Sequence, residues 1–213
     1  MSFRKNFTSI FIIHLLIGGI VVFLPQVVFA EDSWNLRKDK DDITVYTRKV
    51  ENSKILEYKA SVTIDVPLEK VLSIYEDVTK LPSWFHQCVG AQLVEDEGPL
   101  QKIIYVVMDL TGPVATRDVV FKQVKSVEVN GEVSYTLEAV PDKFPLQKGK
   151  VRMPYLNSIW RFTSLPDGRT EVYFRQHSDP GGSIPAFLIN RLVVDIPFHS
   201  LKNLRQMALT GKL

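Results

Sequence analysis

DPGGSIPAFLINRLVVDIPFHSLKNLRQMALTG, the stretch from Asp179 to Gly211, combines a sharp chain break with a long amphipathic segment. Gly181 and Gly182 can adopt backbone angles that are closed to other residues, and we expect Ser183 to cap a helix that tolerates Pro185 in its first turn. Beyond the break, one stripe recurs at three- and four-residue spacing: Phe187, Asn190, Arg191, Val194, Phe198, Leu201, Arg205 and Ala208. Such a helix needs a surface to lie on, so we expect it to cover a sheet formed by the preceding segments.

Those preceding segments are predicted to be mostly strands. Between Trp34 and Ile64 we expect two strands, because apolar and polar residues alternate from Ile43 and again from Leu56. The polar run from Lys38 to Asp42 is interpreted as a turn, since it lacks the Gly and the distal Glu of a calcium-binding loop. The spacing then changes, and Pro67 to Phe85 is predicted to form two short helices.

Further strands are expected after Cys88, separated by turn residues. Their predicted ranges are Ala91 to Glu95, Gln101 to Asp109, Arg117 to Val129, Glu132 to Ala139, Val151 to Phe162 and Thr170 to Ser178. Asn130-Gly131 and Asp167-Gly168 predict hairpin turns, which indicates an antiparallel meander. Ile103 to Met108 is apolar on both faces, so we expect a central strand there. The resulting plan is α+β, an antiparallel sheet followed by one long helix.

Two longer connections interrupt this meander. The segments Leu110 to Thr116 and Val140 to Lys150 contain Pro and Gly, and we expect them to act as gates near the mouth of a cavity.

The first thirty residues have the pattern of a signal peptide. Arg4 and Lys5 precede the apolar core from Ile10 to Leu24, and Val28-Phe29-Ala30 fits a cleavage site. We therefore expect residues 1–30 to be removed and the mature domain, residues 31–213, to be periplasmic or secreted. The alternative is an anchor formed by residues 7–30 that stays in the membrane.

Composition limits the classes of partner. The chain has 26 basic and 24 acidic residues; Arg4 and Lys5 leave with the leader, so the mature domain has 24 of each and no net charge. This balance gives no indication of a nucleic-acid partner, which requires clustered basic residues. Cys88 is the only cysteine, so no disulfide forms within the chain.

Known catalytic and metal-binding motifs are absent from the sequence. It has no G-x-S-x-G elbow, Walker loop, H-E-x-x-H or C-x-x-C pattern, and we expect no cofactor and no metal. His86 and Cys88 are closer to ordinary packing residues than to metal ligands. His177 and Asp179 form either an acid–base pair or, as we favour, a histidine beside a capping aspartate.

Several strings, taken in order, carry a resemblance to a known family. They are Trp34 with ITVYTRKV (Ile43 to Val50), Pro67 to Val71, Trp84-Phe85, GPVATRD (Gly112 to Asp118), KGKVRMP (Lys148 to Pro154) and DPGGSIPAFLIN (Asp179 to Asn190). Together they resemble a START domain, the lipid-transfer domain related to the steroidogenic acute regulatory protein. The resemblance covers about Trp34 to Gly211, and it implies a helix-grip fold in which a curved sheet wraps the C-terminal helix around a lipid-sized cavity. Some sterol-binding members of the family carry a buried acid–base pair on adjacent central strands, and at the corresponding positions this chain has Ile104 and Gln123, which argues against sterol.

The expected ligand-binding residues combine this resemblance with the strand and helix patterns. They are Trp84, Tyr105, Val107, Arg117, Val119, Phe121, Arg152, Trp160, Phe174, Phe187, Asn190, Arg191, Val194 and Phe198. Alternation places Arg117 on the same face as Val119 and Phe121, where a guanidinium needs either a ligand headgroup or a partner in the gate loop. Arg152 and Arg191 allow the same two interpretations.

Three function classes follow from these observations. The first is non-enzymatic binding, and transfer, of a lipid or other hydrophobic molecule, with transient membrane contact. The second is a helix-grip enzyme of the cyclase or hydratase type, which would need His177 and Asp179 aimed into the cavity. The third is an interaction module with a filled core. The sequence does not define the oligomeric state.

Overall fold

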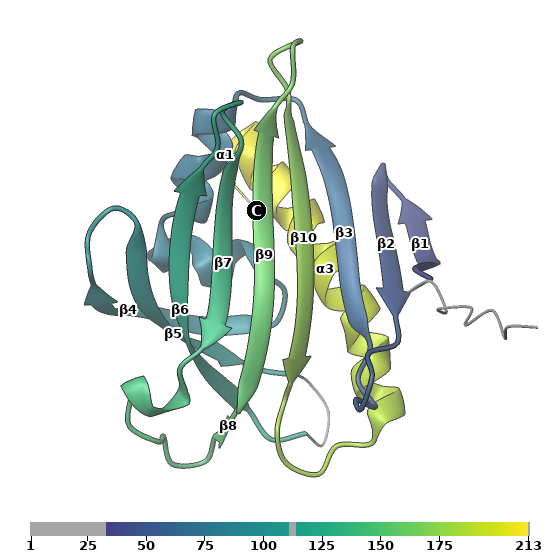
Figure 1. The fold of residues 1–213 in the computed structure, drawn as a ribbon, viewed down its shortest axis with the longest axis vertical. Helices are drawn as coiled ribbons and strands as arrows, with labels where there is room; N and C mark the ends of the chain where they lie inside the picture. Colours follow the sequence, from purple (N-terminus) through teal and green to yellow (C-terminus); the bar gives the residue numbers. More distant parts are fainter. Residues whose placement is uncertain (1–32, 111–113, 213) are drawn as a thin grey trace, which may run out of the picture. The chain divides into compact units, whose positions relative to one another are not determined.

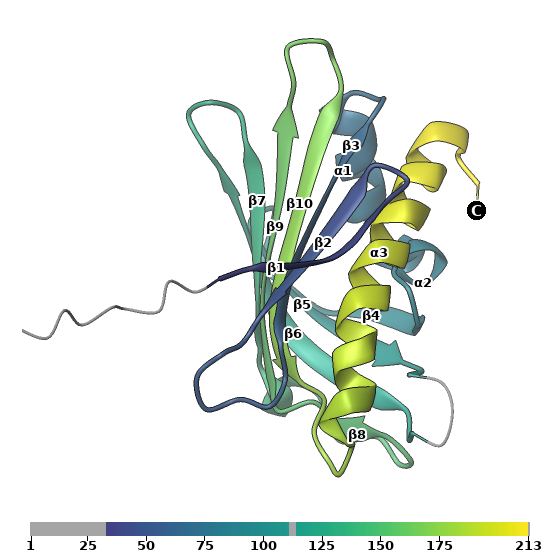
Figure 2. The same cartoon turned by 90° about the vertical axis from the view of Figure 1, so that its right-hand side faces the viewer.

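The computed structural model describes residues 33–110 and 114–212, shown in two views in Figures 1 and 2. Their main element is a ten-stranded sheet in the order β1-β2-β3-β10-β9-β7-β6-β5-β4, with β8 paired to β6. The strands are β1 (Asn35–Lys40), β2 (Ile43–Arg48), β3 (Glu57–Ile64), β4 (Cys88–Asp96), β5 (Gln101–Met108), β6 (Arg117–Val127), β7 (Val133–Ala139), β8 (Val151–Arg152), β9 (Tyr155–Ser164) and β10 (Thr170–Asp179). The helices are α1 (Leu68–Tyr75), η1 (Val78–Lys80), α2 (Leu81–Trp84), η2 (Pro141–Lys143) and α3 (Ala186–Thr210).

The helix α3 covers one face of the sheet together with α1 and α2 (Figure 2). It contacts β2 and β3 on the sheet and both short helices. The predicted fold class is confirmed: the molecule is a curved antiparallel sheet that holds a long C-terminal helix. The expected leader and its cleavage site lie outside the described residues.

The predicted hairpins join β6 to β7 and β9 to β10. Gly131 and Gly168 occupy these turns with φ of +84° and +83°, a region that glycine enters without steric cost. Both hairpin predictions are therefore confirmed.

The N-terminal edge of the sheet differs from the prediction. The polar run expected as a turn contains the second half of β1, and the turn itself is confined to Asp41 and Asp42. An edge strand with both faces wet has no apolar alternation to reveal it, so three strands rather than two precede α1. β1 shifts register between Leu36 and Lys38, and β4, at the opposite edge, shifts twice.

Two further boundaries were predicted incorrectly. The expected strand from Val151 to Phe162 is two strands, because Pro154 lacks the N–H that a continuous ladder needs. Its first part, β8, runs parallel to the start of β6. Ser183 is not the helix cap: α3 begins at Ala186 behind Pro185, without a side-chain cap.

Strand β5 is buried on both faces, as its composition predicted, but it is next to the β4 edge rather than central. One face lies toward α3. The other forms a separate cluster in which Ile103, Tyr105 and Val120 pack against Val140 and Phe144. The connection from Val140 to Lys150, expected as a gate, thus begins as a strap over the outer face of β5 and β6. No helix in the described part of the chain has both the length and the hydropathy required to span a bilayer.

Candidate functional site

A cavity of about 120 Å³ lies between α3 and the sheet. Alternate residues of two paired strands form its floor: Ile104, Val106 and Met108 of β5, and Val119, Phe121 and Gln123 of β6. The side chains that line the cavity include no Asp, Glu, Lys, Arg or His. The two positions compared above with a sterol-binding acid–base pair, Ile104 and Gln123, both face this cavity, and neither is charged.

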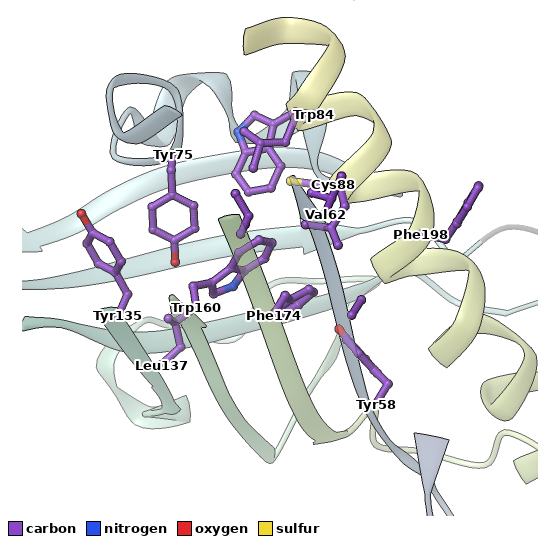
Figure 3. Close-up of a cluster of buried hydrophobic side chains, with 14 of the residues drawn as sticks. Tyr58, Val62, Tyr75, Trp84, Cys88, Tyr135, Leu137, Trp160, Phe174 and Phe198 are labelled. Atoms are coloured by element: carbon purple, nitrogen blue, oxygen red, sulfur yellow. The ribbon is translucent and has the colours of Figure 1, made fainter. Parts of the chain in front are cut away.

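Aromatic side chains from the sheet and from the short helices α1 and α2 form another part of the lining (Figure 3). Trp160 of β9 lines the cavity and stacks on Phe174 of β10, with ring centroids 3.8 Å apart. Trp84 of α2 meets Trp160 edge to face at 5.7 Å, and Tyr75 of α1 lies 5.3 Å from it. Trp84 therefore both packs in the core and borders the cavity, whereas Phe174 is buried behind Trp160.

Two buried polar atoms in the lining have no hydrogen-bond partner within the described residues. They are the Tyr58 hydroxyl and the Trp84 indole Nε1. Burial raises the pKa of Tyr58 well above its usual value, so the hydroxyl stays neutral. A buried polar atom without a partner costs free energy, and a polar atom of a bound molecule would remove that cost.

The helix presents a different face to the cavity from the one predicted. Ile189, Leu192, Val193 and Ile196 line it. Of the predicted helix residues, Phe187 is 73% exposed, the Arg191 side chain is 84% exposed, and Asn190 binds the backbone of Lys54 and Leu56. Val194 packs at the edge of the core, and Phe198 projects away from Trp160 beneath Lys38 (Figure 3).

The sequence did contain a signal for the correct helix face. The predicted stripe included Asn190 and Arg191, whereas Ile189, Val193 and Ile196 form an apolar line with no polar member. At 100° per residue, the stripe that begins at Phe187 and the stripe that lines the cavity are centred about 160° apart, so they lie on nearly opposite faces of the helix. Sequence reasoning missed four further lining residues: Met153, which follows β8, Leu156 of β9, and Gln176 and Ser178 of β10.

Arg117 begins the cavity-facing row of β6 but lies beyond the lining residues. It is 3% exposed, and its Nη1 and Nη2 donate to the backbone carbonyls of Ala115 and Gly181. The second bond is long, at 3.4 Å, and Nε has no partner in the described chain. Burial lowers the pKa of this guanidinium below its usual value. The geometry thus gives Arg117 two backbone contacts and leaves donor capacity free.

Arg152 lies on the other face of β6 and uses every donor. Its Nε and Nη2 bind the two carboxylate oxygens of Asp118 at 3.0 and 3.1 Å. The remaining N–H groups donate to the carbonyls of Pro141, Phe144 and Pro145 in the strap. A guanidinium has five N–H groups, so none remains for a ligand, and Arg152 is not among the residues that line the cavity.

The other expected β5 residues also lie away from the cavity. The Tyr105 ring packs 4.5 Å from Phe144 under the strap, and Val107 belongs to the same outer cluster. Strand alternation explains this, because the odd positions of β5 point opposite to Ile104 and Val106. Of the expected binding residues, those that line the cavity are Trp84, Val119, Phe121 and Trp160.

The candidate acid–base and metal residues are not assembled at the cavity. Gln176 and Ser178 line it, so His177 between them points to the outer face, where it contacts Ser53 and the Tyr155 ring. Asp179 accepts a hydrogen bond from the Gly181 N–H at 2.8 Å, which caps the turn before α3. The His86 ring lies 4.8 Å from that of His199 at a tilt of 37°, and the described residues contain no group of three metal-binding side chains.

The sequence is similar to a known protein family and to individual known proteins. The START domain model matches residues 22–208. An uncharacterised protein of Pseudomonas aeruginosa is 36% identical over 179 residues, which cover 84% of this chain and 88% of that protein. The phosphatidylcholine transfer protein of Rattus norvegicus is 26% identical over 163 residues, covering 74% of this chain and 75% of the relative.

Solved structures show the same architecture. The STAR-related lipid transfer protein of Xanthomonas axonopodis superposes with a TM-score of 0.78 at 33% identity, covering 84% of this chain and all of that one. Human STARD10 gives a TM-score of 0.74 at 19% identity, covering 85% of this chain and 75% of that one.

Proposed function

The chain belongs to the START domain family, and on that basis we propose that it binds a lipid or another hydrophobic molecule in the cavity beneath α3 without catalysing a reaction. The observation that carries this proposal is the uncharged, largely apolar lining. Moving an apolar molecule from water into such a site is favourable by about 25 cal/mol for each Å² buried. The orphan polar atoms of Tyr58 and Trp84 supply a few orienting contacts, as is typical of ligand pockets.

The size of the cavity indicates that binding requires movement. Its volume of about 120 Å³ is near that of an engineered cavity of about 150 Å³ that holds benzene, whereas drug-sized sites measure about 300 to 1,000 Å³. An acyl chain therefore needs α3 to shift outward. The hinge before the helix, Gly181 and Gly182, has φ of +69° and +66° and offers a place for that rotation.

We extend the proposal to transfer between membranes. The rat relative is named for phosphatidylcholine, and at 26% identity we carry over only the class, a lipid with acyl chains. Phe187 lies at the start of α3 and is 73% exposed, so it offers an apolar contact to a bilayer while the ligand enters. We also propose, from the leader pattern, that the domain is exported and acts outside the cytoplasm.

The test compares two substitutions on the same helix. Leu192→Trp fills the cavity from its wall, so binding of a fluorescent acyl lipid should fall at least tenfold while circular dichroism stays unchanged. Phe187→Ala should leave binding in solution intact and slow transfer between vesicles. A folded Leu192→Trp protein that binds the probe with wild-type affinity would overturn the assignment of the cavity.

A further inference from the structure

We infer that Arg117 binds the anionic group, a carboxylate or a phosphate, of an amphiphilic ligand whose apolar part occupies the cavity. This inference rests on the proposed function and specifies the chemistry of its ligand. Val119, Phe121 and Gln123 of β6 point into the cavity. Arg117 lies two residues before Val119, so its side chain is on the same face of the strand. Its strand partner Met108 also lines the cavity, so the guanidinium lies just past one end of the apolar space.

Arg117 is a buried cation without a counter-charge among the described residues. Buried charges in proteins are normally paired, because an uncompensated ion loses its hydration. Arg117 is 3% exposed, yet among the described residues its partners are two neutral carbonyls, and Nε is unsatisfied. Asp118, its neighbour in sequence, is on the opposite face and committed to Arg152. Asp179, in the same hinge, accepts from the Gly181 N–H instead.

The basic residue at the other end of the same β6 row, Lys125, has different surroundings. Lys125 follows Gln123 in the same row, but its Nζ lies 2.6 Å from the Glu76 carboxylate. That carboxylate also accepts a hydrogen bond from the Tyr135 hydroxyl. Lys125 is therefore neutralised within the protein. Of the two basic side chains in this row, Arg117 alone retains charge and donor capacity for a ligand.

The Gly181-Gly182 segment before α3 controls access of a ligand to Arg117. A β-carbon built on Gly182 would lie 3.6 Å from Nη2, so the hinge before α3 lies directly over the guanidinium. The contact that joins them, Nη2 to the Gly181 carbonyl, is the long bond of 3.4 Å, which is weak. When the hinge lifts with α3, this bond breaks and the guanidinium can exchange a neutral carbonyl for an anion. The planar fork of Arg suits both carboxylate and phosphate.

The experiment uses two pairs of probes that differ only in the anionic group. Oleate is compared with oleyl alcohol for a free carboxylate, and dioleoylphosphatidate with dioleoylglycerol for a lipid phosphate. Binding is followed by tryptophan fluorescence, since Trp84 and Trp160 line the cavity. The wild-type protein should prefer the anionic member of at least one pair by about tenfold or more, the range of a charge-assisted hydrogen bond. The pair that shows the preference identifies the source of the anion.

Two variants then locate the preference. Arg117→Met should abolish it while oleyl alcohol or dioleoylglycerol still binds, and Arg117→Lys should retain part of it because the charge remains without the fork. Equal wild-type binding of both members in both pairs, or an undiminished preference in Arg117→Met, would overturn the inference without affecting the proposed function. Failure of the wild-type protein to bind any of the four probes would instead refute the proposed function. The wild-type comparison holds even if Arg117→Met does not fold.

Discussion

Two buried arginines lie at the same level of the sheet and have opposite surroundings. The parallel pairing of β6 with β8 sets Arg117 beside Val151 and Asp118 beside Arg152, so both side chains are in the first two rungs. On the outer face, Arg152 meets a carboxylate and three carbonyls with all its donors. On the inner face, Arg117 meets two carbonyls and keeps Nε unsatisfied.

The difference separates a structural role from a binding role. Arg152 closes the strap over the outer cluster, and every hydrogen bond it can make is already made by the protein. Arg117 is 3% exposed and the Arg152 side chain is 8% exposed, but Arg117 lacks a counter-charge and keeps a donor without a partner in the described chain. What distinguishes the two residues is therefore the number of N–H donors that already have a partner in the protein, and not burial alone.

The largest effect is expected at the outer site. Arg152→Met leaves the completely buried Asp118 without a counter-charge and should lower the free energy of unfolding by about 3 to 5 kcal/mol, measured by urea denaturation. Adding Asp118→Leu to this variant should recover much of the loss, because no buried charge then remains. If Arg152→Met is as stable as the wild type, the pair does not hold the strap.

A smaller effect is expected at the inner site. Arg117→Met removes two hydrogen bonds to neutral carbonyls but also an uncompensated buried charge, so the free energy of unfolding should change by about 1 kcal/mol or less. The same denaturation experiment provides the direct comparison with Arg152→Met. A loss comparable to that of Arg152→Met would show that Arg117 is a structural residue, and the contrast between the two sites would disappear.

The smallest effect is expected from pH, which leaves both arginines charged. Burial and the neighbouring His199 lower the pKa of His86, while Asp195 opposes this shift. The pKa of His199 is lowered by burial and by Lys38 and Lys202, and Asp195 again opposes the shift. Because the unfolded chain takes up protons at about pH 6.5 and the folded chain resists, stability is complete above that pH and falls as the pH drops below it. Unfolding followed from pH 7.5 to 5.5 should show this slope.

The matched variant for this last experiment is His86→Gln with His199→Gln. It should flatten the slope and leave the difference between Arg152→Met and Arg117→Met unchanged. A slope that persists in the double variant would assign the pH dependence to other groups.

The fold was largely predictable because its elements have strong local signals. The long helix has apolar spacing and a Gly-Gly break, and the hairpins have turn residues that require positive φ. The edge strand β1 was not predictable from alternation, since both of its faces are wet. The strand break at Pro154 was visible in the sequence but was outweighed by the apolar residues on either side.

The site was less predictable, since it depends on which face each element buries. Val119, Phe121, Trp84 and Trp160 followed from alternation and aromatic character. The helix face was misjudged because two stripes compete in α3, and only contact with β2 and β3 selects one. The contrast between Arg117 and Arg152 depends on partners distant in sequence, the Gly181 carbonyl and the strap, which no local pattern reveals.

The two edges of the sheet have a consequence for self-association. A regular, apolar outer strand exposes backbone N–H and C=O groups that can template pairing with another chain and lead to polymerisation. Here β1 is polar and shifts register once, and β4 shifts register twice along its length. Neither edge presents the straight ladder that an incoming strand requires. Pairing of a strand from another chain with either edge is therefore disfavoured, which protects the domain against fibril formation.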